Sequence, residues 1–414
     1  MLYVLSTSWA LLLGMLLLLV GNGLQGTLLG IRGAIEGHDA ETMAFVMSGY
    51  YLGFLFGSMR ATPMIARVGH VRVFAALAST ISAAFILYAA ATEAWMWTLM
   101  RFVVGFSFAG VYVVAESWLN DAATNETRGK ALSLYMIVQM VGIISAQFIL
   151  TVTDPGGYTP FVVMSVLVSV SFLPILLKPG GAPAFQTTKP MTLGQLFRIS
   201  PLGCVGTFML GGVYAGTFAM ASVYGTARGL SVPQISAFVA TIYTGGLVSQ
   251  WPIGWISDRM DRRRLILILT AAGATMTGVG ALFTDSFAAI LGLGFVIGAV
   301  ANPLYALIIA YTNDFLGPQD MAAASSGLLF INGLGAMSGP FVIGAMMTRI
   351  GADAYFGYIG GLFALIALYA AYRMTRRPSP PSSEPYAPVL PQASPVAVEA
   401  AQGVAIDRAS EARG

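Results

Sequence analysis

Three charged side chains fall inside long apolar stretches of the sequence, where charge is least expected. Arg101 opens the stretch Arg101-Phe-Val-Val-Gly, Glu116 follows fifteen residues later in Ala-Glu116-Ser-Trp, and Arg60 lies within an earlier stretch. A charge at the centre of a bilayer costs roughly 2.5 to 3.5 kcal/mol on insertion scales, so such a residue is by default a candidate for function. The chemistry of these three side chains decides what the surrounding elements must position.

Glu116 is the one acidic residue that we place inside an apolar stretch. A carboxyl group that is removed from water can take up and release a proton near neutral pH. We therefore name Glu116 as the candidate for proton coupling. The alternative is that Glu116 ends a helix and pairs with Arg128 or Lys130 in the loop that follows.

The two arginines offer a different chemistry, because a guanidinium group binds a carboxylate through charge-assisted hydrogen bonds. Arg101 is a candidate for binding such a group, and the alternative is that its side chain reaches the membrane interface past Trp95 and Trp97. Arg60 either pairs with an acidic residue or favours an anionic solute, and the sequence leaves both possibilities open.

The composition excludes a water-soluble protein. Charged residues make up 9% of the 414 residues and hydrophobic residues 57%, whereas a soluble domain carries about 25% charged residues. The balance of 21 basic and 18 acidic residues implies no nucleic-acid partner. A single cysteine, Cys204, excludes an internal disulfide, and two separated histidines, His38 and His70, form no metal-binding pattern. We expect no cofactor and no metal.

The apolar segments predict twelve membrane-spanning helices, since each span needs about 20 residues. They lie near residues 9–31, 43–66, 73–92, 98–119, 131–153, 160–177, 201–227, 235–257, 265–284, 286–312, 322–348 and 354–372. One set of loops holds most of the Lys and Arg residues, whereas the opposite set holds Arg32, Arg228 and Arg349. The positive-inside rule therefore predicts that both termini are cytoplasmic.

The predicted organisation is two six-helix bundles joined by a linker. The first bundle spans residues 1–177, the cytoplasmic linker 178–200 and the second bundle 201–377; the linker ends in a short amphipathic stretch, 193–199. The composition of residues 378–414, rich in Pro, Ser, Ala and Glu, predicts a disordered cytoplasmic tail.

The two halves match each other at a nearly constant spacing. Gly105 corresponds to Gly298 and Tyr112 to Tyr305 at an offset of 193 residues, and the segment 21–27 corresponds to 211–217 at an offset of 190. Because each half has an even number of spans, the halves share one orientation and form parallel repeats related by an axis along the membrane normal.

One loop carries a recognisable motif, Gly254-Trp-Ile-Ser-Asp258-Arg259-Met-Asp-Arg262. It resembles the G-x-x-[SA]-D-R-x-G-R-R signature of the major facilitator superfamily. The matching first-half loop keeps Arg67 but has Ala66 in place of the acid. The segment beginning at Arg101 resembles the R-x-x-x-G-x-G pattern of the same superfamily, with Ser107 in place of the second glycine. The Ala-Glu-Ser-Trp segment looks most like the YcaD-like bacterial subgroup.

The resemblance implies a secondary carrier, not an enzyme, whose helices rearrange so that a central site faces one side and then the other. In such a fold the motif loops stabilise one access state; here they comprise Gly254, Asp258, Arg259, Arg262 and Arg67. Substrate-binding candidates are the polar and aromatic residues of the spans expected to form the core: Asn22, Gln25, Tyr51, Arg101, Tyr112, Gln139, Tyr214, Tyr243, Asn302, Tyr305 and Asn332.

The favoured function is proton-coupled movement of a small organic solute across the bacterial cytoplasmic (inner) membrane by a monomer in contact with lipid. The alternatives are an efflux antiporter for drugs or metabolites and a facilitated uniporter. An antiporter is weakened because span five lacks the Gly-Pro motif typical of many such carriers. A channel or non-transporting sensor of the same fold is the alternative of another class.

Overall fold

The computed structural model describes residues 2–123, 125–177, 191–376, 386–389 and 393–411, and the regular elements within these ranges are helices. Twelve of these helical stretches are long and apolar enough to cross a membrane, which agrees with the predicted number of spans. The elements are α1 (Leu2–Ile35), α2 (Ala40–Val68), α3 (His70–Ala90), α4 (Ala94–Ala122), α5 (Asn125–Val152), α6 (Thr159–Ser171), α7 (Leu173–Leu177), α8 (Leu193–Ile199), α9 (Pro201–Tyr214), η1 (Ala215–Met220), α10 (Ala221–Ala227), α11 (Val232–Ser257), α12 (Arg262–Gly280), η2 (Ala281–Phe283), α13 (Phe287–Asn313), α14 (Pro318–Ile350), α15 (Ala354–Arg376) and α16 (Pro395–Glu411).

Two of the membrane spans are not continuous α-helices. The sixth span is divided into α6 and α7 at Pro174, which lacks a backbone N–H and whose ring would clash, in a continuous helix, with the carbonyl group four residues earlier. The seventh span consists of α9, the π-helical turn η1 and α10. Single π-helical turns inside α-helices are frequent at functional sites.

Side-chain caps define several helix starts. The Asp39 carboxylate accepts a hydrogen bond of 2.8 Å from the backbone N–H of Thr42 and begins α2. Thr192 and Gln195 form a capping box at the start of α8, whose bounds coincide with the predicted amphipathic stretch.

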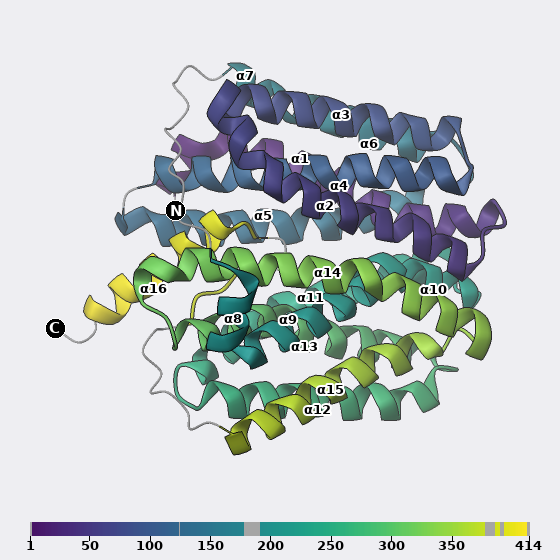
Figure 1. The fold of residues 1–414 in the computed structure, drawn as a ribbon. Coiled ribbons are helices and arrows are strands. Elements are labelled where there is room, and N and C mark those ends of the chain that lie inside the picture. Colours follow the sequence, from purple (N-terminus) through teal and green to yellow (C-terminus); the bar gives the residue numbers. More distant parts are fainter. Residues whose placement is uncertain (1, 124, 178–190, 377–385, 390–392, 412–414) are drawn as a thin grey trace. The chain divides into compact units, whose positions relative to one another are not determined.

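The chain forms two compact units. Unit 1 comprises Met1–Phe185, Ala215–Ala240 and Met337–Tyr355, and unit 2 comprises Gln186–Tyr214, Thr241–Ala336 and Phe356–Gly414. In unit 1, α2 runs along α4, α1 packs on α5 and α6, and α3 packs on α4 and α6 (Figure 1). In unit 2, α13 packs on α12 and α9. The predicted division into bundles 1–177 and 201–377 stays a prediction.

Glycines allow α2 and α4 to approach within backbone contact. A Cβ built on Gly53 would overlap the carbonyl oxygen of Phe102, and a Cβ on Gly105 would overlap the carbonyl oxygen of Tyr50. Each helix therefore supplies a glycine where the other helix's backbone presses against it. Small residues at such crossings permit the close van der Waals packing that holds membrane helices together.

The same arrangement recurs in unit 2 between α11 and α13. A Cβ on Gly245 would overlap the carbonyl oxygen of Phe295, and a Cβ on Gly298 would overlap that of Ile242. Gly298 is the repeat partner of Gly105, and Gly245 follows Gly53 at the similar offset of 192 residues. The repeat found in the sequence is therefore confirmed in the packing of these two helix pairs.

The C-terminal tail departs from the prediction of disorder. Within its described residues, Pro395–Glu411 form α16, and Tyr386, Val389 and Val398 are buried. The bias toward Pro and Ser hid a run rich in Ala, which is the best helix former, and in Val. The prediction of disorder for residues 378–385, 390–392 and 412–414 lies outside the described residues.

Candidate functional site

Arg101 is buried in unit 1 and does not reach toward the interface. Arg101 is 4% exposed, and its guanidinium carbon lies 4.8 Å from the centroid of the Tyr50 ring. At this distance the cation and the aromatic face attract each other. The structure therefore contradicts the interfacial alternative and places the positive charge among the helices.

Two polar residues of α1 complete the surroundings of Arg101. The Gln25 side chain donates a hydrogen bond of 2.7 Å to the hydroxyl group of Tyr88, and the Asn22 side chain is hydrogen-bonded to Tyr50. Asn22 and Gln25 are three residues apart, so they share one face of α1. Four helices, α1 to α4, thus each contribute to one group, which we call the Arg101 cluster: Asn22, Gln25, Tyr50, Tyr88 and Arg101.

The Arg101 cluster keeps hydrogen-bonding capacity for a further group. Within the described part of the chain, Arg101 Nε and Gln25 Oε1 are buried and have no hydrogen-bond partner, and no ion pair there includes Arg101. Buried polar atoms are normally satisfied, so exceptions call for an explanation. A cationic donor beside an amide oxygen and two phenols is suited to a polar solute with an anionic group.

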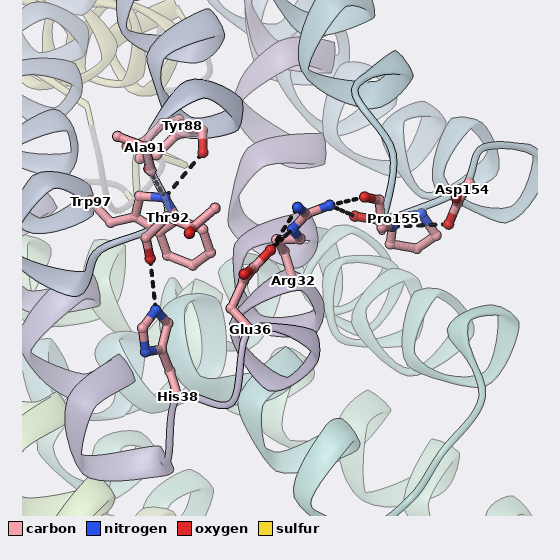
Figure 2. Close-up of polar contacts among 10 residues, drawn as sticks. Arg32, Glu36, His38, Tyr88, Ala91, Thr92, Trp97, Asp154 and Pro155 are labelled. Atoms are coloured by element: carbon pink, nitrogen blue, oxygen red, sulfur yellow. Dashed lines mark hydrogen bonds and ion pairs between the residues drawn. The ribbon is translucent and has the colours of Figure 1, made fainter.

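Hydrogen bonds near the start of α4 hold this helix in register with α3. The Trp97 indole donates to the carbonyl oxygens of Tyr88, at 3.1 Å, and Ala91, at 2.8 Å, while His38 Nε2 lies 2.9 Å from the carbonyl oxygen of Thr92 (Figure 2). Because Trp97 lies one turn before Arg101, these contacts orient the arginine over the cluster.

Glu116 forms a second buried group, about 22 Å farther along α4. Its side chain is fully buried and interacts with the phenol of Tyr135 on α5, which also interacts with Tyr112. Tyr112 lies one turn before Glu116 and packs against Phe54 and Phe108, with ring centroids 6.2 and 6.0 Å away. Burial among phenols separates the carboxyl group from water in this arrangement.

The candidates of unit 2 make hydrogen bonds to nearby backbone. Tyr214 donates to the carbonyl oxygen of Ala301 at 2.9 Å, and its ring centroid lies 6.4 Å from that of Tyr305. Asn302 donates to the carbonyl oxygen of Gly298, within its own helix, at 3.3 Å. Asn332 donates to the carbonyl oxygen of Thr207 at 3.2 Å and so links α14 to α9. These bonds fit a packing role for at least three of the candidates.

The remaining predicted residues differ in burial. Tyr51 is half-buried beside the Tyr50 ring, whose centroid is 5.7 Å away. Gln139 on α5 and Tyr243 on α11 are buried. Arg60 is exposed on α2, so it does not join the Arg101 cluster.

The switch loop predicted from the motif has a buried centre and an exposed rim. Arg262 is 3% exposed and bonds the Asp314 carboxylate at 2.5 Å and the carbonyl oxygen of Ala310 at 3.1 Å. Arg262 also lies 3.9 Å from the carboxylate of Asp258. Arg259 stacks on Trp255, with the guanidinium carbon 4.0 Å from the ring centroid. The loop thus connects the ends of α11, α12 and α13.

The first-half loop is built differently. Arg67 is exposed, whereas His70 is 1% exposed and its Nε2 lies 2.9 Å from the hydroxyl oxygen of Ser117, directly after Glu116. A histidine therefore joins α3 to α4 in the half whose loop lacks the acidic residue of the motif.

Three residues of the two groups were not predicted from the sequence: Tyr50, Tyr88 and Tyr135. Tyr50 directly precedes Tyr51, the candidate chosen in this segment, which the sequence repeat matches to Tyr243 at an offset of 192 residues. Tyr88 and Tyr135 stand alone in apolar runs, where a tyrosine is ordinarily a packing residue.

Twelve apolar spans that enclose a few buried charges and polar clusters are typical of a multi-pass membrane protein. The family model of the Major Facilitator Superfamily matches residues 11–271 and 203–397. The chain therefore belongs to the Major Facilitator Superfamily.

Relatives and solved structures agree with this membership. An uncharacterized MFS-type transporter of Enterobacter sp. strain 638 is 27% identical over 84% of this chain and 90% of the relative. YcaD of Escherichia fergusonii is 25% identical with the same coverage of both chains. A crystal structure of the nucleoside transporter NupG has a TM-score of 0.77 at 14% identity and covers 88% of this chain and 99% of that one. The structural likeness shows a shared fold.

Proposed function

We propose that the protein is a proton-coupled secondary transporter for a small organic solute with an anionic group. It works by alternating access in the bacterial cytoplasmic membrane, with both termini in the cytoplasm. The observation that carries this proposal is the buried guanidinium group of Arg101, which faces phenols and an amide rather than a carboxylate. A solute carboxylate supplies the charge partner that the cluster lacks within the described residues.

Glu116 supplies the proton-binding group in this proposal. It lies on the same helix as Arg101, so one movement of α4 changes the surroundings of both side chains. The protonated side chain of Glu116 is neutral and is tolerated in the apolar interior. After the proton is released, the carboxylate is charged, and an arrangement that exposes it to water is favoured. Coupling follows if each charge state prefers a different access state.

Contacts inside unit 1 support alternating access. Ser222 of α10 donates a hydrogen bond of 3.3 Å to the carbonyl oxygen of Gly26, and a Cβ on Gly30 would overlap the Ser222 hydroxyl group. Phe45 of α2 meets Phe341 of α14 edge to face, with ring centroids 4.9 Å apart. First-half and second-half helices therefore touch at the end where α1 and α2 are joined. Access from that end requires these contacts to separate.

A two-stage experiment tests the proposed function. Purified protein is first screened by thermal shift against small carboxylic acids, amino acids, sugars, nucleosides and cationic drugs. Hits are then tested for counterflow of labelled solute in proteoliposomes. Saturable trans-stimulation by an anionic hit is the expected result. Its absence across the panel would count against a carrier and favour a channel or sensor of the same fold.

A further inference from the structure

The described part of the C-terminal tail is attached to the end of α11 by Tyr386. A Cβ built on Gly254 would lie 2.7 Å from Cδ1 and 2.8 Å from Cε1 of the Tyr386 ring, so the ring packs directly on this glycine. The Tyr386 hydroxyl group accepts a hydrogen bond of 3.1 Å from Gln250 Nε2. Tyr386 itself is 8% exposed, so most of its apolar surface is removed from water.

The tail also engages the acidic residue of the switch loop. The backbone N–H of Tyr386 donates a hydrogen bond of 2.7 Å to Asp258 Oδ1. Arg262 approaches the same oxygen no closer than 3.9 Å, because it is held at 2.5 Å by Asp314. The short contact of Asp258 is therefore made to the tail rather than to the motif arginine.

A second point of attachment follows along the tail. Val398 of α16 is 1% exposed and, with Gln402, lines a cavity whose other walls include Ala306 and Ala310 of α13. Gln402 Oε1 accepts no hydrogen bond within the described residues although it is buried. Such an unsatisfied group weakens an interface, so this attachment is suited to release.

We propose that residues 386–389 and 393–406 form an intramolecular strap that binds the α11–α12 loop and acts as a brake on its rearrangement. A contact made in one state stabilises that state relative to every state in which it is broken. The tail binds Asp258 and covers Gly254, two residues of the motif loop. A change in that loop must therefore first release Tyr386, and the effect on transport rests on the proposed function.

Hydrogen exchange of the full-length protein in lipid nanodiscs tests the strap. The amides of Asp258, Arg259 and Met260 bond to carbonyl groups of residues 254 and 256. Tyr386→Ala should speed their exchange by at least about fivefold, because the strap no longer holds the loop. Pro388→Ala is the matched control, because Pro388 is exposed in the same segment and should leave exchange unchanged.

The reciprocal variant is Gly254→Ala, whose methyl group displaces the Tyr386 ring without altering any charge. It should speed exchange of residues 386–389 by a similar factor, because coupling between two sites is mutual. If Tyr386→Ala leaves the loop unchanged, or if residues 386–389 of the wild type exchange as fast as an unstructured peptide, the strap is overturned. Unaltered reactivity of the buried Cys204 thiol verifies that each variant is folded.

A transport measurement then tests the brake. Tyr386→Ala should raise counterflow turnover of a confirmed hit at least about twofold, with Pro388→Ala at the wild-type value. Equal or lower turnover would overturn the brake. Absent counterflow in the wild type and both variants would count against the proposed function, whereas the exchange result decides the strap independently.

Discussion

Replacing Gly49 by alanine tests the close packing of α2 and α4 beside Arg101. A Cβ at this position would lie 2.6 Å from the carbonyl oxygen of Thr98, which is 0.8 Å short of the 3.4 Å where ordinary van der Waals contact begins. It would also lie 3.3 Å from Cβ of Arg101. The obstacle is backbone, so the helices must separate. Overpacking of this kind costs about 1 to 3 kcal/mol.

The unfolding temperature should fall by about 2 to 12 °C, since each kcal/mol shifts it by about 2 to 4 °C in a domain of 150 to 250 residues. A thiol-reactive fluorogenic dye measures unfolding directly, because Cys204 is the chain's single cysteine and is 4% exposed.

Gly292→Ala is the matched control for this experiment. Gly292 lies in α13, and a Cβ built on it meets no neighbouring atom within 4 Å. Its replacement by alanine therefore causes no clash and exchanges a weak helix former for a strong one. The variant should unfold at the wild-type temperature or above it. If Gly49→Ala unfolds together with Gly292→Ala, the backbone contact between α2 and α4 is refuted.

Three further predictions address the site, a helix cap and access. Arg101→Gln should weaken binding of a carboxylate hit by about tenfold to hundredfold, since a bond to a charged group contributes about 1.5 to 3 kcal/mol; equal affinity in titration calorimetry would refute the cluster as its site. Hydrogen bonds from the first turn of α2 lower the pKa of Asp39 below its ordinary 3.8, so the stability that it adds exists above that value and is lost as pH falls through the folded pKa. Asp39→Ala should therefore lower the free energy of unfolding at pH 7 by about 0.5 to 2 kcal/mol. In thermal melts this difference should shrink as the pH falls below 3.8 and vanish below the folded pKa. Gly30→Val should separate α1 from α10 and speed maleimide labelling of a cysteine at Ser222 in a Cys204→Ser background; an unchanged rate would show that this contact does not gate access.

Hydropathy and glycine spacing predicted the fold because both reflect constraints that act along the whole chain. Each span must be apolar over its length, and each close crossing must place a small residue at the same point in both repeats. The correspondence of Gly105 and Gly298 was found from the sequence alone, and the structure adds their packing role at the helix crossings.

The site was predicted only in part, because a pattern along one helix does not fix which face meets its neighbours. Asn22, Gln25 and Arg101 stood out as polar residues in apolar spans, and the structure brings them together. Tyr51 was chosen where Tyr50 makes the contact, since adjacent helical residues differ by about 100° in direction. The choice depends on tertiary packing.

The tail was mispredicted for a different reason. Composition measures whether a segment can form a core of its own, and residues 386–389 and 393–406 do not need one. Tyr386 and Val398 are instead buried against α11 and α13, whose surfaces supply the missing apolar partners.

Accumulation of a counterflow-competent solute under an imposed pH difference tests the central claim of proton coupling through Glu116. With one proton per solute, a difference of one pH unit, about 1.4 kcal/mol, drives accumulation up to about tenfold in wild-type proteoliposomes. Glu116→Gln, which keeps the shape of the side chain but cannot release a proton, should still exchange solute yet accumulate none. Accumulation by Glu116→Gln at the wild-type level would contradict the role assigned to this residue.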